Sequence, residues 1–207
     1  MRKKYKKRLI IISVIIIALL SLFIGIKYLK KEDKEHQKVN VIDSLDQFNY
    51  NLEDRDTELF KENYELLKEV LKKDSIDDLE YAKYLAKLFI IDLFTINNKI
   101  SKYDVGGIEY IHPDYVDGYK LNVEQTLYLT LENNVDGKRI QELPEVKSVN
   151  VIEVKEDKYI LNEEEKDAIV VNLEWTYIED YGYDTSANVT CLKIDDKMYI
   201  AQYAITE

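Results

Sequence analysis

The amino-acid sequence predicts an α+β protein in which about three helices pack on an antiparallel sheet of about four strands, behind an N-terminal transmembrane helix. Residues 9–26 carry no charge, apolar residues between 44 and 134 recur at helical spacing, and strand-like spacing follows Pro144. The predicted parts, in chain order, are a basic cytoplasmic tail over 1–8, a membrane helix over 9–29, a polar tether over 30–43 and a domain over 44–207.

The apolar segment over 9–26 is long enough to cross a bilayer. Eighteen helical residues rise about 27 Å, and continuing to Leu29 gives about 31 Å, the thickness of the hydrocarbon core. A cleaved signal peptide is the alternative, but its apolar core is shorter and ends in small residues, which do not follow here. Six Lys and Arg residues precede the segment and three closely follow it, so we expect the N-terminus in the cytoplasm.

The charge of the chain is divided sharply along its length. All 40 acidic residues but only 20 of the 29 basic residues lie after position 31, which leaves residues 32–207 with a net charge of −20. Such an acidic domain is repelled by phosphates, so the charge argues against nucleic-acid binding. The single cysteine, Cys191, excludes an internal disulfide and is expected to be a small buried apolar residue.

The first predicted helix of the domain runs from Ser44 to Lys73. Ser44 and Gln47 have the spacing of a capping box, and Leu45, Phe48 and later apolar residues recur near helical spacing.

The second predicted helix opens at Asp78 and runs to Ile100. Its apolar residues form one wide stripe, and Lys83, Lys87 and Lys99 are expected on other faces.

An irregular stretch separates this helix from the third. Gly106 and Gly107 lack the pattern of a phosphate-binding loop and predict a turn with positive φ. The third helix is predicted to start at Asn122 and to end at Asn133 or Asn134.

After Pro144 the pattern is that of strands. The segments rich in Val, Ile, Tyr and Thr are 146–154, 169–178, 189–194 and 198–205. Only Asp195, Asp196 and Lys197 join the last two, which is right for a hairpin and too short for a crossover. In the second segment, apolar residues alternate with polar ones, so one face is expected to be buried.

The order of elements, with the aromatic-bearing hairpin LKIDDKMYIA over 192–201, resembles the nuclear transport factor 2-like, or cystatin-like, α+β fold. This resemblance covers 44–207 and implies a cone-shaped domain whose curved sheet wraps around a long helix. With one membrane span in front, the chain is similar to the bitopic inner-membrane scaffold of type IV secretion and conjugation machines, and to uncharacterised membrane-anchored proteins of low-GC Gram-positive bacteria.

The fold that the chain resembles also hosts ketosteroid isomerase-like enzymes, whose carboxylate base lies in an apolar cavity. Trp175, Tyr177, Tyr199 and Tyr203 fall on alternating positions of two predicted strands. They are the candidates for a pocket or an interaction face on the sheet, against the alternative that they are ordinary packing residues.

No catalytic, cofactor or metal site is predicted. His112 lies beside Asp114, but the only other histidine, His36, does not complete a metal-binding spacing. The acidic clusters do not follow the calcium-loop pattern, and no nucleophile motif surrounds Cys191. We therefore expect a protein without cofactors, and enzymatic activity has no positive indication.

The expected function follows from the anchor and from the absence of a catalytic motif. The composition, rich in Lys, Ile, Asn and Tyr, is typical of an AT-rich bacterial genome. We expect a noncatalytic, single-pass membrane protein whose extracytoplasmic domain binds another protein, or a second copy of itself, in a cell-envelope or transfer assembly. The alternatives are a small-ligand-binding or isomerase-like module with a pocket on the sheet, and a contact with cell-wall polysaccharide through tyrosines.

Overall fold

The computed structural model describes residues 38–206, which belong to one compact unit, Gln37–Glu207. The predicted cytoplasmic tail and the predicted membrane helix over 9–29 lie outside the described residues. Among the helices over 38–206, none combines the length and the apolar character that crossing a membrane requires.

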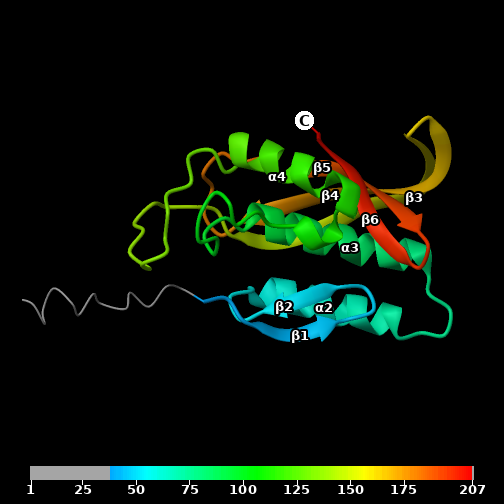
Figure 1. The fold of residues 1–207 in the computed structure, drawn as a ribbon, viewed down its shortest axis with the longest axis horizontal. Coiled ribbons are helices and arrows are strands. Elements are labelled where there is room, and N and C mark those ends of the chain that lie inside the picture. Colours follow the sequence, from blue (N-terminus) through cyan, green and yellow to red (C-terminus); the bar gives the residue numbers. More distant parts are fainter. Residues whose placement is uncertain (1–37, 207) are drawn as a thin grey trace, which may run out of the picture. The chain divides into compact units, whose positions relative to one another are not determined.

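The described residues form an α+β domain with three helices on a four-stranded antiparallel sheet, which confirms the predicted fold class (Figure 1). A separate two-stranded sheet precedes the first of these helices. The elements in chain order are β1 (Val41–Leu45), β2 (Tyr50–Glu53), α2 (Glu58–Leu71), α3 (Asp78–Phe94), η1 (Ile108–Tyr110), η2 (Pro113–Tyr115), α4 (Val116–Gln125), β3 (Val146–Leu161), β4 (Glu164–Tyr177), β5 (Ser186–Ile194) and β6 (Lys197–Ile205).

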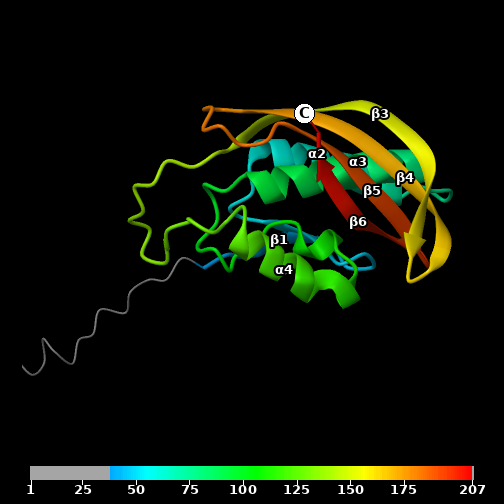
Figure 2. The same ribbon diagram turned by 90° about the horizontal axis from the view of Figure 1, so that it is seen from above.

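The larger sheet has the order β3-β4-β5-β6, and all neighbouring strands are antiparallel. Figure 2 shows it curving over α3. The predicted hairpin between the last two strands is confirmed, and Asp195 takes the positive φ of 54° that its tight turn requires. The predicted alternation in β4 is confirmed as well, because Val171 and Leu173 are buried whereas Glu174 is exposed.

The first two strands of this sheet extend further than the sequence predicts. β3 and β4 stay paired as far as Leu161 and Glu164, whereas β5 pairs with β4 only from Ala168 onward. The extra length is a two-stranded arm with water on both faces. Its residues are mostly charged, so no apolar alternation marked it as strand.

Helix α3 forms the centre of the core and starts where the sequence predicts. The Asp77 side chain accepts hydrogen bonds from the backbone N–H groups of Leu79 and Glu80, which caps the helix. The helix ends at Phe94 rather than at residue 100, because Thr95 leaves helical geometry with φ −83° and ψ 81°.

The predicted helix from Ser44 is wrong in its first half. Residues 41–53 form the β1–β2 hairpin, and Ser44 donates a side-chain hydrogen bond to Asn51 across it instead of capping a helix. Asn49 turns the chain with a φ of 55°, a conformation that asparagine tolerates and a helix excludes. Helix α2 begins at Glu58, where Thr57 is the actual N-cap.

The predicted third helix is also displaced. Helix α4 is already complete at Gln125, close to where the sequence places its start. The chain leaves helical geometry at Thr126, whose hydroxyl donates to the backbone carbonyl of Asn122. The following turns are held against α3 by Tyr128, whose buried hydroxyl donates to the carbonyl of Leu93 at 2.7 Å. The apolar spacing after Asn122 therefore reflects packing of turns.

Candidate functional site

Two of the four aromatic residues singled out by the sequence are packed in the core. Trp175 is 2% exposed, and its ring centroid lies 4.8 Å from that of Phe94. Its Nε1 donates to the Tyr177 hydroxyl at 2.8 Å, and that hydroxyl donates to the carbonyl of Asp184 at 2.6 Å. Both polar atoms thus have partners within the fold, as expected for aromatic residues that stabilise a core.

The other two aromatic residues lie on β6, two strands away from β4. Tyr199 contacts the His112 ring edge-on, with centroids 5.0 Å apart, and Tyr203 packs on Phe89 at 5.5 Å. Tyr203 also lines a groove beside α4 together with Tyr119. The structure therefore does not gather the four aromatic side chains around one cavity.

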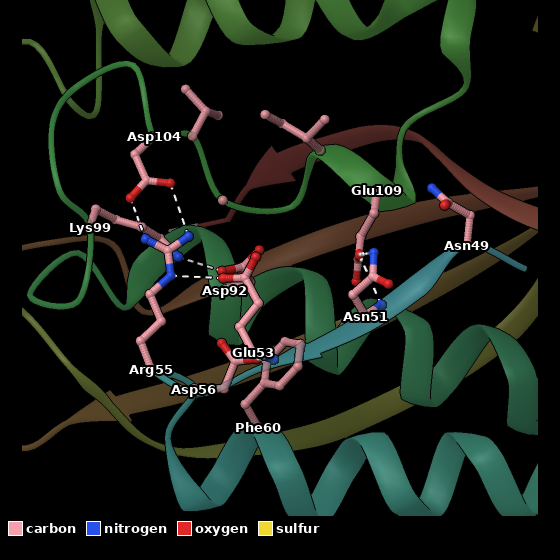
Figure 3. A pocket seen from close by; sticks show the side chains of 13 residues that line it. Asn49, Asn51, Glu53, Arg55, Asp56, Phe60, Asp92, Lys99, Asp104 and Glu109 are labelled. Carbon is pink, nitrogen blue, oxygen red and sulfur yellow. Dashed lines mark hydrogen bonds and ion pairs between the residues drawn. The ribbon is translucent and has the colours of Figure 1, made fainter. Parts of the chain in front are cut away.

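A polar cavity lies elsewhere, between β2, the start of α2, the end of α3 and the loop that follows α3 (Figure 3). Its volume is about 300 Å³. We call it the acidic pocket, because five carboxyl groups line it against two basic side chains. The lining residues are Asn49, Asn51, Glu53, Arg55, Asp56, Phe60, Asp92, Lys99, Asp104, Val105, Gly106, Ile108 and Glu109.

Asp92 and Lys99 form an ion pair at the centre of this pocket. Lys99 is 1% exposed and donates to Asp92 Oδ1, so the residue that was expected on another face than the apolar stripe is buried as well. Asp92 Oδ2 accepts a hydrogen bond from the backbone N–H of Gly107 at 2.6 Å. A buried lysine requires such a partner, so the pair is part of the architecture of the loop.

The two glycines of the loop allow this close approach. Gly107 has the predicted positive φ, at 77°. A Cβ atom on Gly106 would lie 2.3 Å from the carbonyl oxygen of Asp92, so no larger residue fits there.

Arg55 and Asp104 form a second ion pair on one side of the pocket. Arg55 Nη2 donates to Asp104 Oδ1 at 3.0 Å and Nη1 donates to Oδ2, while Nε donates to Glu53 at 2.8 Å. Burial alone would raise the pKa of Asp104, but the hydrogen bonds and charge of Arg55 outweigh it and the pKa is lowered. The guanidinium group is therefore fully engaged.

Glu109 lies on the other side of the pocket and forms no ion pair with any residue that the structure describes. Its Oε2 accepts hydrogen bonds from the backbone N–H and the side-chain amide of Asn51, at 3.0 and 3.2 Å. Burial first, and then the charge of Asp92, raise the pKa of Glu109 to about 8. This carboxyl group is consequently protonated at neutral pH.

Asp56 is the second carboxyl group of the pocket that forms no ion pair within residues 38–206. It accepts a hydrogen bond from the backbone N–H of Glu53 at 2.7 Å. Burial raises the pKa of Asp56 to about 6, against the lowering effect of that hydrogen bond. Carboxyl groups with raised pKa values inside one cavity are typical of binding and proton-transfer sites.

The chemistry available in the pocket is that of carboxyl groups. Over residues 38–206, no set of three or more His, Cys, Asp or Glu side chains is arranged to hold a metal ion. Carboxyl groups that differ in pKa, beside amides, can accept hydrogen bonds from a ligand and exchange protons with it.

The residues that pair in this site are distant in the chain, so no local sequence pattern predicts it. Arg55 and Asp104 are 49 residues apart, and Asn51 and Glu109 are 58 apart. One local signal existed, namely Asp92, a charge inside the otherwise apolar run over 88–94.

Comparisons with known proteins do not assign the site. The chain matches no known protein family, and neither a curated protein nor a solved structure matches it significantly.

Proposed function

We propose that this chain is a noncatalytic, single-pass membrane protein whose acidic domain is held outside the cytoplasm and binds another protein, or a second copy of itself, in a cell-envelope assembly. The observation that carries this proposal is the order of charges. An uncharged stretch over 9–26 lies between two basic clusters, and a domain with an excess of 20 acidic charges follows.

The surface of the described domain supports recognition of a polypeptide. Within residues 38–206, the outer edge of β3 pairs with no other strand along its 16 residues. Ile152 and Ile160 project from this strand with exposures of 57% and 72%. An unpaired edge with apolar side chains can accept a strand from a partner, and the neighbouring charges of β3 limit indiscriminate pairing.

The topology is tested with the only native cysteine as an internal control. Cys191 is 1% exposed and burial raises the pKa of its thiol, so it reacts slowly with maleimides. We expect an impermeant maleimide to label the variant Glu69→Cys, at an exposed position of α2, in intact cells. The variant Lys4→Cys should be labelled only after permeabilisation. The opposite pattern would refute the proposed orientation.

The interaction is tested by crosslinking in native membranes, followed by mass spectrometry. We expect a crosslinked species that the variant Ile160→Glu reduces severalfold and the control variant Glu69→Gln leaves unchanged. Recovery of uncrosslinked monomer alone would contradict a role in an assembly.

A second candidate function, the binding of a small ligand, is favoured by the acidic pocket. Its volume of about 300 Å³ lies at the lower end of the range for ligand sites. Titration of the full chain with pentane-1,5-diamine tests it.

A further inference from the structure

We propose that the acidic pocket binds a primary alkylammonium group, which supplies the positive charge that Glu109 and Asp56 lack. This inference rests on the proposed ligand-binding function and not on the membrane anchor. Failure of the ligand to bind would leave the proposed topology intact, and a wrong topology would leave the ligand site intact.

The balance of charges in the pocket selects a cation. Lys99 is paired with Asp92, and Arg55 is paired with both Asp104 and Glu53. Glu109 and Asp56 form no ion pair among the described residues. A buried carboxyl group without a counter-charge stays neutral or acquires a partner, and an incoming cation is that partner.

A buried hydroxyl group faces the same carboxyl groups. Tyr110 is 0% exposed, and its hydroxyl has no hydrogen-bond partner of good geometry in the described part of the chain. Burial first, and then the charges of Glu109 and Asp92, raise the pKa of Tyr110, and a polar contact with the Glu109 carboxyl group acts in the same direction. A buried polar group without a well-aligned partner is rare in folded proteins, and here it marks the polar surroundings of Glu109 beside the pocket.

The available acceptors fit an ammonium group. Both hydrogen bonds from Asn51 end on Glu109 Oε2, and Oε1 accepts none of good geometry within the described residues. Asp56 likewise uses only Oδ2, toward the N–H of Glu53. An ammonium group carries three N–H donors and no acceptor, which matches the remaining oxygens of Glu109 and Asp56 once these carboxyl groups have released their protons.

The size of the pocket restricts the ligand further. A cavity of about 300 Å³ accommodates one small amine or one lysine side chain. Phe60, Val105 and Ile108 supply apolar surface, against which the methylene groups of such a ligand can pack. Asn49, which is exposed, lies on the rim and leaves the pocket open to solvent.

The charged and titratable groups around Glu109 set the pH dependence of binding. Asp92 on α3 is acidic, and Lys197 on β6 donates to the Glu109 carbonyl at 3.2 Å and interacts with its charge. The phenols of Tyr50 on β2, Tyr64 on α2 and Tyr110 also lie within range of that charge. Burial keeps Glu109 protonated at neutral pH, so binding of an ammonium group must release its proton. The affinity should therefore increase as the pH rises toward 8.

The experiment is calorimetric titration of the detergent-solubilised full chain with pentane-1,5-diamine. Pentane-1,5-diol is the uncharged control of similar length. We expect the diamine to bind and the diol not to bind, with an affinity at least about tenfold higher at pH 8.5 than at pH 6. Equal binding of diol and diamine, or an affinity that does not change with pH, would overturn the proposal.

The variant Glu109→Gln keeps an acceptor for Asn51 and should weaken binding at least about tenfold. Glu69→Gln, on the exposed face of α2, should leave it unchanged. If Glu109→Gln does not fold, Asp56→Asn replaces it and should weaken binding severalfold. Undiminished binding to a folded pocket variant would refute the assignment.

A capped lysine peptide, titrated in parallel, distinguishes the source of the amine. Tighter binding of the peptide supports the proposal with a partner's lysine side chain as the ligand. Tighter binding of the diamine supports it with a free amine. Binding of neither refutes it.

Discussion

The protonation of Glu109 couples the stability of the domain to pH, and the variant Glu109→Gln should remove this coupling. Glutamine has nearly the same shape and retains an oxygen that accepts the hydrogen bond from the Asn51 N–H. It differs from glutamate in that it cannot lose a proton. The comparison of the two proteins therefore isolates one titration.

The sign of the effect follows from the direction of the shift. The pKa of Glu109 is raised from 4.5 to about 8, so the folded state holds a proton that the unfolded state has released. This contribution to stability is fully present below pH 4.5 and is lost as the pH rises through about 8.

The size of the effect follows from the same shift. At about 1.4 kcal/mol per pKa unit, the full loss would approach about 5 kcal/mol. Since Glu109 is half-buried, solvent screening reduces it, and we expect roughly 2–3 kcal/mol.

The assay is urea unfolding of the full chain in detergent at several pH values from 5 to 8.5. Trp175, the only tryptophan of the chain, reports on the core of the domain. Carboxyl groups with lowered pKa values, such as Asp104, act in the opposite direction, but they are common to both proteins and cancel in the difference. We expect the stability of Glu109→Gln relative to wild type to rise steadily with pH. A difference that stays constant would refute the buried, protonated state of Glu109.

Two further predictions concern the loop and the ion pair that shape the pocket. Gly106→Ala should destabilise the domain by at least about 3 kcal/mol, because the new methyl group would overlap the Asp92 carbonyl. Gly118→Ala is the matched control, since that position in α4 has open space around it, and it should stabilise the domain by about 0.5–1 kcal/mol. Arg55→Ala should lower the free energy of unfolding by about 2 kcal/mol, because among the described residues Asp104 then keeps only the Ile100 N–H as a hydrogen-bond donor. Arg55→Lys should lower it by about half as much. Thermal unfolding of the two glycine variants and the two arginine variants measures these differences.

The parts of the fold that the sequence predicted well are those with a regular apolar pattern. β4 alternates between buried and less buried residues from Val171 to Tyr177, and the apolar residues of α3 lie in the core. The β1–β2 hairpin was misread because Leu45, Phe48 and Leu52 have helical spacing, although they belong to a hairpin and the turn that joins its strands. Short strands give too few alternations to outweigh such a coincidence, and only the turn at Asn49 decides between the two.

The candidate site was beyond sequence reasoning for a different reason. Periodicity reports which residues face the core, but it does not report which charges meet there. Lys99 illustrates this, because its position outside the regular stripe suggested exposure, and its burial depends on Asp92 reaching it from α3. Pairings of this kind emerge only when the loop after α3 folds back over β2.

The proposed anchor and the proposed ligand site are independent, yet together they explain how a modest pocket could serve a cell-envelope protein. One ammonium group in a small, open cavity gives an affinity near the millimolar range, about 4 kcal/mol. A free domain would bind a lysine side chain too weakly for a stable complex. A domain confined to the membrane surface meets a membrane-bound partner at an effective concentration of about that magnitude, so the same contact becomes occupied. Removing the anchor should then abolish the complex in cells while leaving binding of the diamine to the domain unchanged, which separates the two contributions.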